Sequence, residues 1–201
     1  MTDMWSVMFS RSGMLMTSAT TQKEQGDLDA AIETLRAAYL VAAEEGVDHG
    51  IQAHLRLPLY LHRAGRKAEA WAEFNHLALE GYPGMEERGR DRMILNLSAI
   101  FDKMRLTLQR DKMPEQAVRF GVWSLLCMLG ESSSISHLSK DWIAQETTKL
   151  LKKAKRLDLL PVVLEMIDGE LLRSEFNLPL LGERIDHLFG IDTSYHLPEL
   201  P

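Results

Sequence analysis

The stretch that decides the fold is Gly26-Asp27-Leu28-Asp29-Ala30-Ala31-Ile32, which separates two segments whose apolar residues recur every three or four positions. That spacing is the period of an amphipathic α-helix, and a glycine is typical of the point where a helix ends. Residues 29–45 then carry an apolar stripe on one helical face: Ala30, Ala31, Leu35, Ala38, Tyr39 and Ala42. The stretch therefore predicts two consecutive helices joined by a tight turn.

The helical period continues along most of the chain, and glycine and proline fall in clusters between the periodic segments. Signals for β-strands are nearly absent. Besides the helix that Gly26 closes, we expect helices over residues 29–45, 50–64, 68–79, 87–110, 114–129, 139–154, 161–173 and 180–189. The predicted fold class is all-α, with about 8–10 helices packed as antiparallel pairs.

Residues 50–64 also admit an interpretation as a strand, because four leucines alternate with other residues. These are Leu55, Leu57, Leu59 and Leu61. Pro58 decides against the strand, since proline cannot donate a hydrogen bond to a central strand ladder. In a helix the same proline removes one hydrogen bond and imposes a kink. We therefore predict a kinked helix over this range.

Three turns share an arrangement of small and large residues. Gly26 precedes Ala31, Gly65 precedes Ala70, and a weaker version around Lys112 precedes Ala117. The arrangement resembles the tetratricopeptide motif, in which a glycine ends the first helix and a small alanine lets the second helix approach it. The three alanines are unevenly spaced, by more than the roughly 34 residues of a regular repeat, so the connections between pairs must be lengthened.

The resemblance covers roughly residues 12–129 and implies a short α-solenoid of stacked helix pairs. We expect a Met-rich N-terminal segment over 1–13, repeat-like pairs over 14–130, C-terminal helices packing on the same core over 131–190, and a tail over 191–201. Small residues at first-helix contacts are typical of the family, whereas Pro58 and Arg105 occupy two of those positions here.

Proteins of this family bind partners on a concave surface formed mostly by the first helices. The resemblance places Met16 and Thr20 on that surface, together with the groove residues Lys23, Gln52, Leu55, Leu59, His62, Arg63, Asp102, Leu106, Gln109 and Arg110. Three of these would place positive charge at corresponding turns, which suits an acidic peptide or a C-terminal carboxylate: Lys23, Arg63 and Arg110. The alternative interpretation is that they are ordinary cations near helix C-termini.

Composition and charge narrow the class of protein. Hydrophobic residues at 45% and charged residues at 26% are ordinary for a globular chain, and the net charge of −6 argues against a generic nucleic-acid binder. The basic run over residues 149–156 is the best candidate for a local basic patch, although helix dipoles attract cations to such ends. The single cysteine, Cys127, lies in an apolar run where we expect it to be buried. A reducing cytoplasm is the natural compartment, and no run is long enough to cross a membrane.

No motif with a recognisable chemistry is present. His49, His54 and His62 lack the i, i+4 spacing of a helical zinc site, and the sequence has neither a phosphate-binding glycine loop nor a nucleophile elbow. We therefore expect no cofactor, no metal and no catalytic residues.

These patterns predict a non-catalytic module that binds a protein or peptide partner. One alternative is a self-associating structural or regulatory protein that forms a homodimer through its Met-rich N-terminus or its C-terminal helices. A weaker alternative is a helical enzyme or nucleic-acid-binding regulator whose site carries no known motif.

Overall fold

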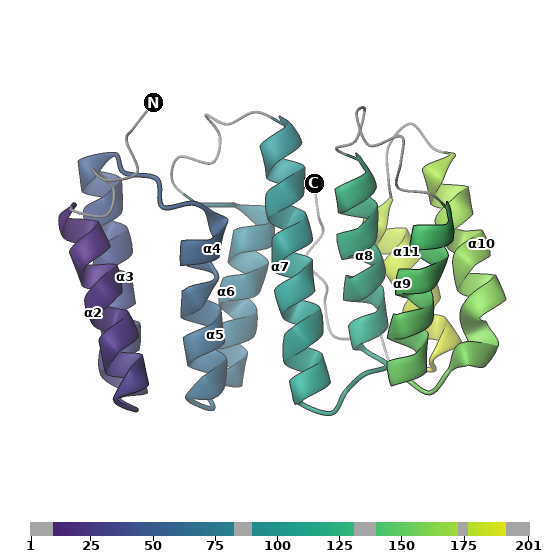
Figure 1. Cartoon of the computed structure of the whole chain (residues 1–201), viewed down its shortest axis with the longest axis horizontal. Coiled ribbons are helices and arrows are strands. Elements are labelled where there is room, and N and C mark those ends of the chain that lie inside the picture. The colour runs from purple at the N-terminus through teal and green to yellow at the C-terminus, as the bar shows by residue number, and fades with distance from the viewer. Residues whose placement is uncertain (1–9, 83–89, 131–139, 173–176, 192–201) are drawn as a thin grey trace. The chain divides into compact units, whose positions relative to one another are not determined.

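The computed structural model describes residues 10–82, 90–130, 140–172 and 177–191 of the 201-residue chain. Within these residues the regular structure is helical and there is no strand, which confirms the all-α class. The helices are α2 (Arg11–Glu24), α3 (Leu28–Glu45), α4 (Ile51–His54), α5 (Arg56–Arg63), α6 (Lys67–Leu79), α7 (Arg90–Arg110), α8 (Ala117–Gly130), α9 (Lys140–Lys153), the 3₁₀ turn η2 (Leu157–Leu159), α10 (Leu160–Leu171) and α11 (Leu178–Leu188) (Figure 1). None of them is long and apolar enough to cross a membrane.

The chain divides into two compact units, residues 1–89 and 90–201. In the first unit α2 packs against α3, α3 against α5, and α5 against α6. In the second unit α7 packs against α8, which also contacts α9 and α11, and α10 packs against α9. Partners that follow one another in the chain run antiparallel, as Figure 1 shows within each unit. The predicted packing in antiparallel helix pairs is confirmed.

One turn geometry closes α2, α5, α7 and α9. The second residue after each of these helices has a positive φ: Gly26 at 89°, Gly65 at 79°, Lys112 at 62° and Lys155 at 57°. The next N–H then bonds a carbonyl of the preceding helical turn at 2.9 Å: Asp27 to Gln22, Arg66 to Leu61, Met113 to Leu108, and Arg156 to Leu151. This pattern is a Schellman turn, which favours glycine at the left-handed position. The prediction that Gly26 closes its helix is confirmed.

The second helix of each predicted repeat begins with a buried alanine. Ala31, Ala70 and Ala117 are all fully buried. Ala31 and Ala70 contribute to the core of the first unit, which also contains Ile32 and Leu35. The small side chains let paired helices pack closely at these points. Assignment to tetratricopeptide repeats stays a prediction.

The core of the second unit is built on aromatic rings. Trp123 of α8 meets Phe101 of α7 and Phe120 edge-on, with ring centroids 5.1 and 5.5 Å away. Gly182 lets α11 approach this core, since a Cβ there would lie 2.4 Å from the Trp123 ring. Cys127 is buried nearby on α8 and forms no disulfide, which confirms its expected burial.

Two predicted helix boundaries differ from the structure. The expected single helix over 50–64 is two helices, α4 and α5, that meet at Leu55. Pro58 has no N–H to offer the carbonyl four residues earlier, so the helical hydrogen bonding is interrupted there. Pro114 does not open a helix as predicted, because it lies in a turn and α8 begins at Ala117. The Met-rich residues 1–9 and most of the tail lie outside the described residues.

Candidate functional site

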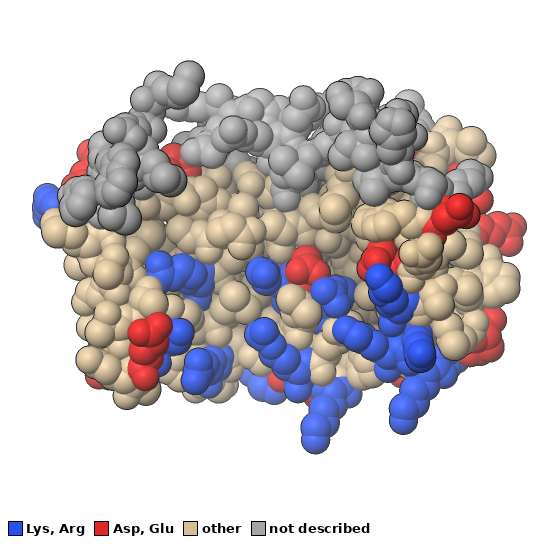
Figure 2. All heavy atoms as spheres, viewed as in Figure 1, with Lys and Arg blue, Asp and Glu red and all other residues tan. Residues whose placement is uncertain are grey.

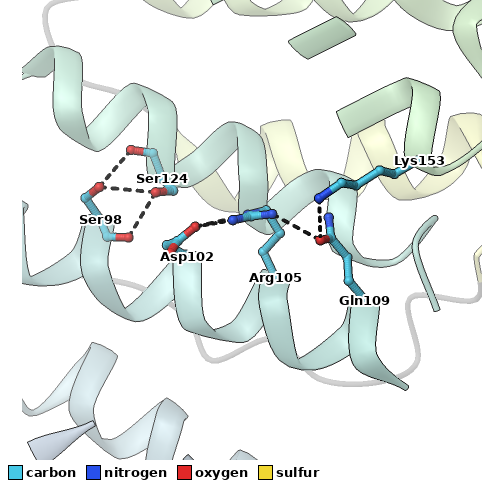
Figure 3. A network of polar contacts seen from close by, with 6 residues as sticks. All are labelled: Ser98, Asp102, Arg105, Gln109, Ser124 and Lys153. Carbon is cyan, nitrogen blue, oxygen red and sulfur yellow. Dashed lines mark hydrogen bonds and ion pairs between the residues drawn. The ribbon is translucent and has the colours of Figure 1, made fainter. Parts of the chain in front are cut away.

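A row of linked polar side chains follows one face of α7 (Figure 3). Arg105 donates from Nε to Asp102 Oδ1 at 3.1 Å, and from Nη1 to Gln109 Oε1 at 3.2 Å. Residues three and four positions apart share a helical face, which is why these side chains meet. The structure therefore brings together Asp102 and Gln109, which the groove prediction included, through Arg105, which it did not.

Lys153 of α9 joins this row from a second helix. Its Nζ donates to Gln109 Oε1 at 3.2 Å, so the same amide oxygen receives donors from α7 and α9. Gly121 of α8 makes room behind the contact, since a Cβ there would lie 2.5 Å from Leu150 Cδ1 and 3.1 Å from Arg105 Cδ. The missing side chain at Gly121 therefore allows the side chains of Arg105 and Leu150 to approach α8 closely.

Two buried serines fix α7 on α8 above the polar row (Figure 3). Ser98 Oγ donates to the backbone carbonyl of Ser124 at 3.0 Å, and Ser124 Oγ donates to the carbonyl of Ser98 at the same distance. This reciprocal pair satisfies both hydroxyl groups in the core and restrains the register of the two helices. These hydrogen bonds therefore hold α7, which carries the polar row, against α8.

An open hollow lies where α7 and α9 end. Gln109, Lys112, Pro114 and Lys153 line it, and its volume is about 410 Å³. Figure 2 shows Lys and Arg side chains gathered at the lower edge of the face on which α7 and α9 end. The C-terminal end of a helix carries partial negative charge, so lysines are stable there.

The cations around the hollow divide into paired and unpaired groups. Lys149 lies 2.6 Å from Glu146, and Arg156 lies 3.2 Å from Asp158. Five cations have no ion-pair partner among the described residues: Arg110, Lys112, Lys152, Lys153 and Lys155. All five are exposed. They give this end of the second unit an unneutralised positive charge.

The groove residues predicted in the first unit have varied surroundings. Gln52 and Arg63 are exposed, Leu59 and His62 are half-buried, and Leu55 is only 1% exposed. The Leu55 side chain therefore packs in the core and does not line a surface. Leu55 lies at the break between α4 and α5. Because of this break, the residues on either side of it do not continue one helical face. Lys23 is half-buried, 3.9 Å from Glu24.

Arg56 fills the space between α2 and α5, where the groove was predicted to pass Met16 and Thr20. Its Nη2 donates to the Met16 carbonyl at 2.7 Å and also to the Thr20 hydroxyl. Met16 is itself buried in the core. Arg56 therefore fastens the two first helices of this unit together, a role that its sequence context gave no reason to predict.

A serine and a histidine lie close together at the start of α2. Ser12 Oγ is 2.8 Å from His49 Nε2 and 2.8 Å from Glu45 Oε2. Such proximity is the first requirement for an activated nucleophile. However, Ser12 is fully buried, and Glu45 also accepts the N–H groups of Arg11 and Ser12, each at 3.2 Å. The carboxylate satisfies the free N–H groups of α2, so the cluster joins α2 to the end of α3.

The titratable groups of the first unit respond to these contacts. The Ser12 hydroxyl holds the pKa of the Glu45 carboxyl below its usual range. The ring of His54 stacks between Tyr39 and Tyr82, with centroids 4.6 and 4.3 Å away, and burial lowers its pKa to about 4. Within the described part of the chain, no three His, Cys, Asp or Glu side chains group so as to hold a metal ion.

These residues define an all-α protein of antiparallel helix pairs with a polar, cation-rimmed hollow where two first helices end. A scan against protein-family models, a search of curated proteins and a search of solved structures found no match.

Proposed function

We propose that this protein is a non-catalytic interaction module that binds a segment of a partner protein across the ends of α7 and α9. The observation that carries the proposal is the open hollow lined by Gln109, Lys112, Pro114 and Lys153. Because the hollow is open and is lined by a glutamine, two lysines and a proline, it suits a few side chains of a bound segment.

The polar row on α7 supports this proposal because it offers donors that are already oriented. Arg105 and Lys153 both donate to the oxygen of Gln109, which leaves the Gln109 amide N–H groups to donate to a partner. Side chains held by hydrogen bonds before binding lose less entropy when the partner arrives. Asp102 and Arg105 extend the same row along the helix and lengthen the contact surface.

The resemblance to tetratricopeptide repeats and a cytoplasmic location belong to the same proposal. In that family the first helices of successive pairs form the binding surface, and α7 and α9 hold those places in the second unit. The Cys127 thiol is buried and forms no disulfide, which is compatible with a reducing compartment.

Photo-crosslinking tests the proposal. A photoreactive residue replaces Leu106, on the α7 surface, and in a matched control it replaces the exposed Glu183 on α11. We expect the Leu106 position to crosslink to one contiguous segment of one partner, mapped by mass spectrometry, and the Glu183 position to leave that segment unlabelled. Equal labelling from both positions would refute the proposed surface, and crosslinks only to a second copy of this chain would establish the homodimer instead.

A further inference from the structure

We infer that the segment bound at this end is acidic, and that Lys112 and Lys155 hold its carboxylates. The inference rests on the proposed function for the presence of a bound segment and adds the chemistry that selects it. Three observations carry it: the backbone conformation of the two lysines, the proximity of their turns, and the charge of their surroundings.

The backbone conformation is unfavourable for lysine. Lys112 and Lys155 have φ of 62° and 57°, in the left-handed region that glycine adopts without strain. The equivalent turns of the first unit carry Gly26 and Gly65. The turns that close α7 and α9 therefore have a cation where glycine would be more stable, whereas the turn that closes α11 in the same unit carries Gly190. Strained backbone conformations lower stability and cluster at functional sites, so these two turns point to a function.

The two turns lie close together in the second unit. Lys112 lines the hollow opposite Lys153, which is two residues from Lys155. Arg156, the residue after Lys155, is near enough to Glu115 in the other turn for their charges to interact. The two strained lysines therefore belong to one end of the unit and can contact a single segment.

The turns after α7 and α9 carry positive charge, whereas the whole chain has a negative net charge. The chain has a net charge of −6, yet Lys112 and Lys155 have no anionic partner among the described residues. The helix dipole stabilises Lys152 and Lys153 in the last turn of α9. It does not explain Lys112 and Lys155, because glycine at their left-handed positions would leave the interaction of the dipole with Lys152 and Lys153 unchanged. Charge complementarity therefore favours a segment rich in Asp and Glu. The negative net charge disfavours nucleic acid, whose binding requires a dominant positive field.

The test uses the full chain with Lys112→Gly and Lys155→Gly combined. Glycine keeps the left-handed turns, removes the two charged side chains and relieves the backbone strain, so the melting temperature should rise by about 2–4 °C for each relieved turn. The probes are a fluorescein-labelled peptide of alternating Asp and Glu and its Asn/Gln counterpart, followed by fluorescence anisotropy at low salt. We expect wild type to bind only the acidic peptide, and the double variant to bind it about tenfold more weakly.

Two control proteins make the result specific. Arg11→Gln with Arg184→Gln removes the same charge from exposed sites on α2 and α11, and it should leave binding unchanged. Lys112→Arg with Lys155→Arg keeps the charge and the strain, and it should retain binding. Equal affinity in wild type and the double glycine variant, or equally effective competition by an oligonucleotide of the same charge, would overturn the inference.

The crosslink from Leu106 separates this inference from the proposed function. A partner segment that is captured equally by wild type and by the double glycine variant would overturn the role of the lysines and leave the binding surface standing. Absence of a specific crosslink in wild type would contradict the proposed function itself, regardless of how the acidic and Asn/Gln peptides bind.

Discussion

Tyr39 contacts His54 in two ways: its hydroxyl donates to the His54 carbonyl at 3.3 Å, and its ring stacks on the imidazole with centroids 4.6 Å apart. The same hydroxyl donates to the carbonyl of Ala53 at 2.8 Å. Pro58 cannot supply an N–H to His54, so Tyr39 provides the missing donor where α4 and α5 meet. The proline that interrupts one helix is therefore compensated by a side chain of α3.

Tyr39→Phe should keep the ring stack and leave the two carbonyl groups without that donor. We expect the free energy of unfolding to fall by about 1–2 kcal/mol, measured by urea denaturation. Tyr60→Phe is the matched control, because the Tyr60 hydroxyl has only a 3.5 Å contact with Arg56. Equal stabilities for wild type and Tyr39→Phe would show that the hydrogen bond does not compensate Pro58.

The stacked His54 should make the protein sensitive to acid. Its pKa in the folded protein is about 4, below the usual 6.5, because burial disfavours the charged ring. The unfolded chain therefore binds the proton first, so stability should fall as the pH drops from about 6.5 to about 4, by about 3 kcal/mol in total. His54→Phe keeps a stacking ring without a proton to bind, and its stability should vary less over that range. Parallel pH profiles for the two proteins would contradict the prediction.

Glu45→Gln tests the anchor at the start of α2. The pKa of Glu45 is lowered by the Ser12 hydroxyl, so the ionised form stabilises the fold above its ordinary pKa, and this stabilisation is lost as the pH falls through the lowered value. The variant should melt below wild type at neutral pH, and the two melting temperatures should converge in acid. A difference that is constant with pH would mean that the ionised carboxylate contributes nothing specific.

Gly121→Ala should destabilise the second unit, since its Cβ would lie 2.5 Å from Leu150 and would displace Arg105. We expect a loss of about 1–3 kcal/mol in chemical denaturation. Gly169→Ala provides the contrast within α10, where a Cβ would meet nothing within 4 Å and should add up to about 1 kcal/mol of helix stability. If both variants changed stability in the same direction, the close approach at Gly121 would not matter.

Local sequence patterns predicted the helices but not all of the turns. The apolar period and Gly26 and Gly65 marked where the first two pairs turn, because glycine has a strong conformational preference. Lys112 and Lys155 adopt the same turn without any such signal. Their conformation follows from the hydrogen bonds that close α7 and α9, which residue preferences alone do not show.

The residues of the candidate site were also predicted only in part. Asp102 and Gln109 were predicted together because the resemblance to tetratricopeptide repeats places both on the groove face of α7. Lys153 joins them from α9 by donating to Gln109, and Gly121 of α8 leaves room for the Arg105 side chain. Both contributions depend on how the helices pack, so the spacing of residues within one helix does not predict them. Leu55 was predicted to line a groove, but the break caused by Pro58 places its side chain in the core.

Hydrogen–deuterium exchange of the full chain, with and without the partner segment captured from Leu106, tests the central claim most directly. If the segment binds where α7 and α9 end, backbone amides of the last turns of both helices and of the turn containing Lys112 should exchange more slowly in the complex, while α11 should be unchanged. Protection confined to the first unit or to α11 would contradict a binding surface at this hollow.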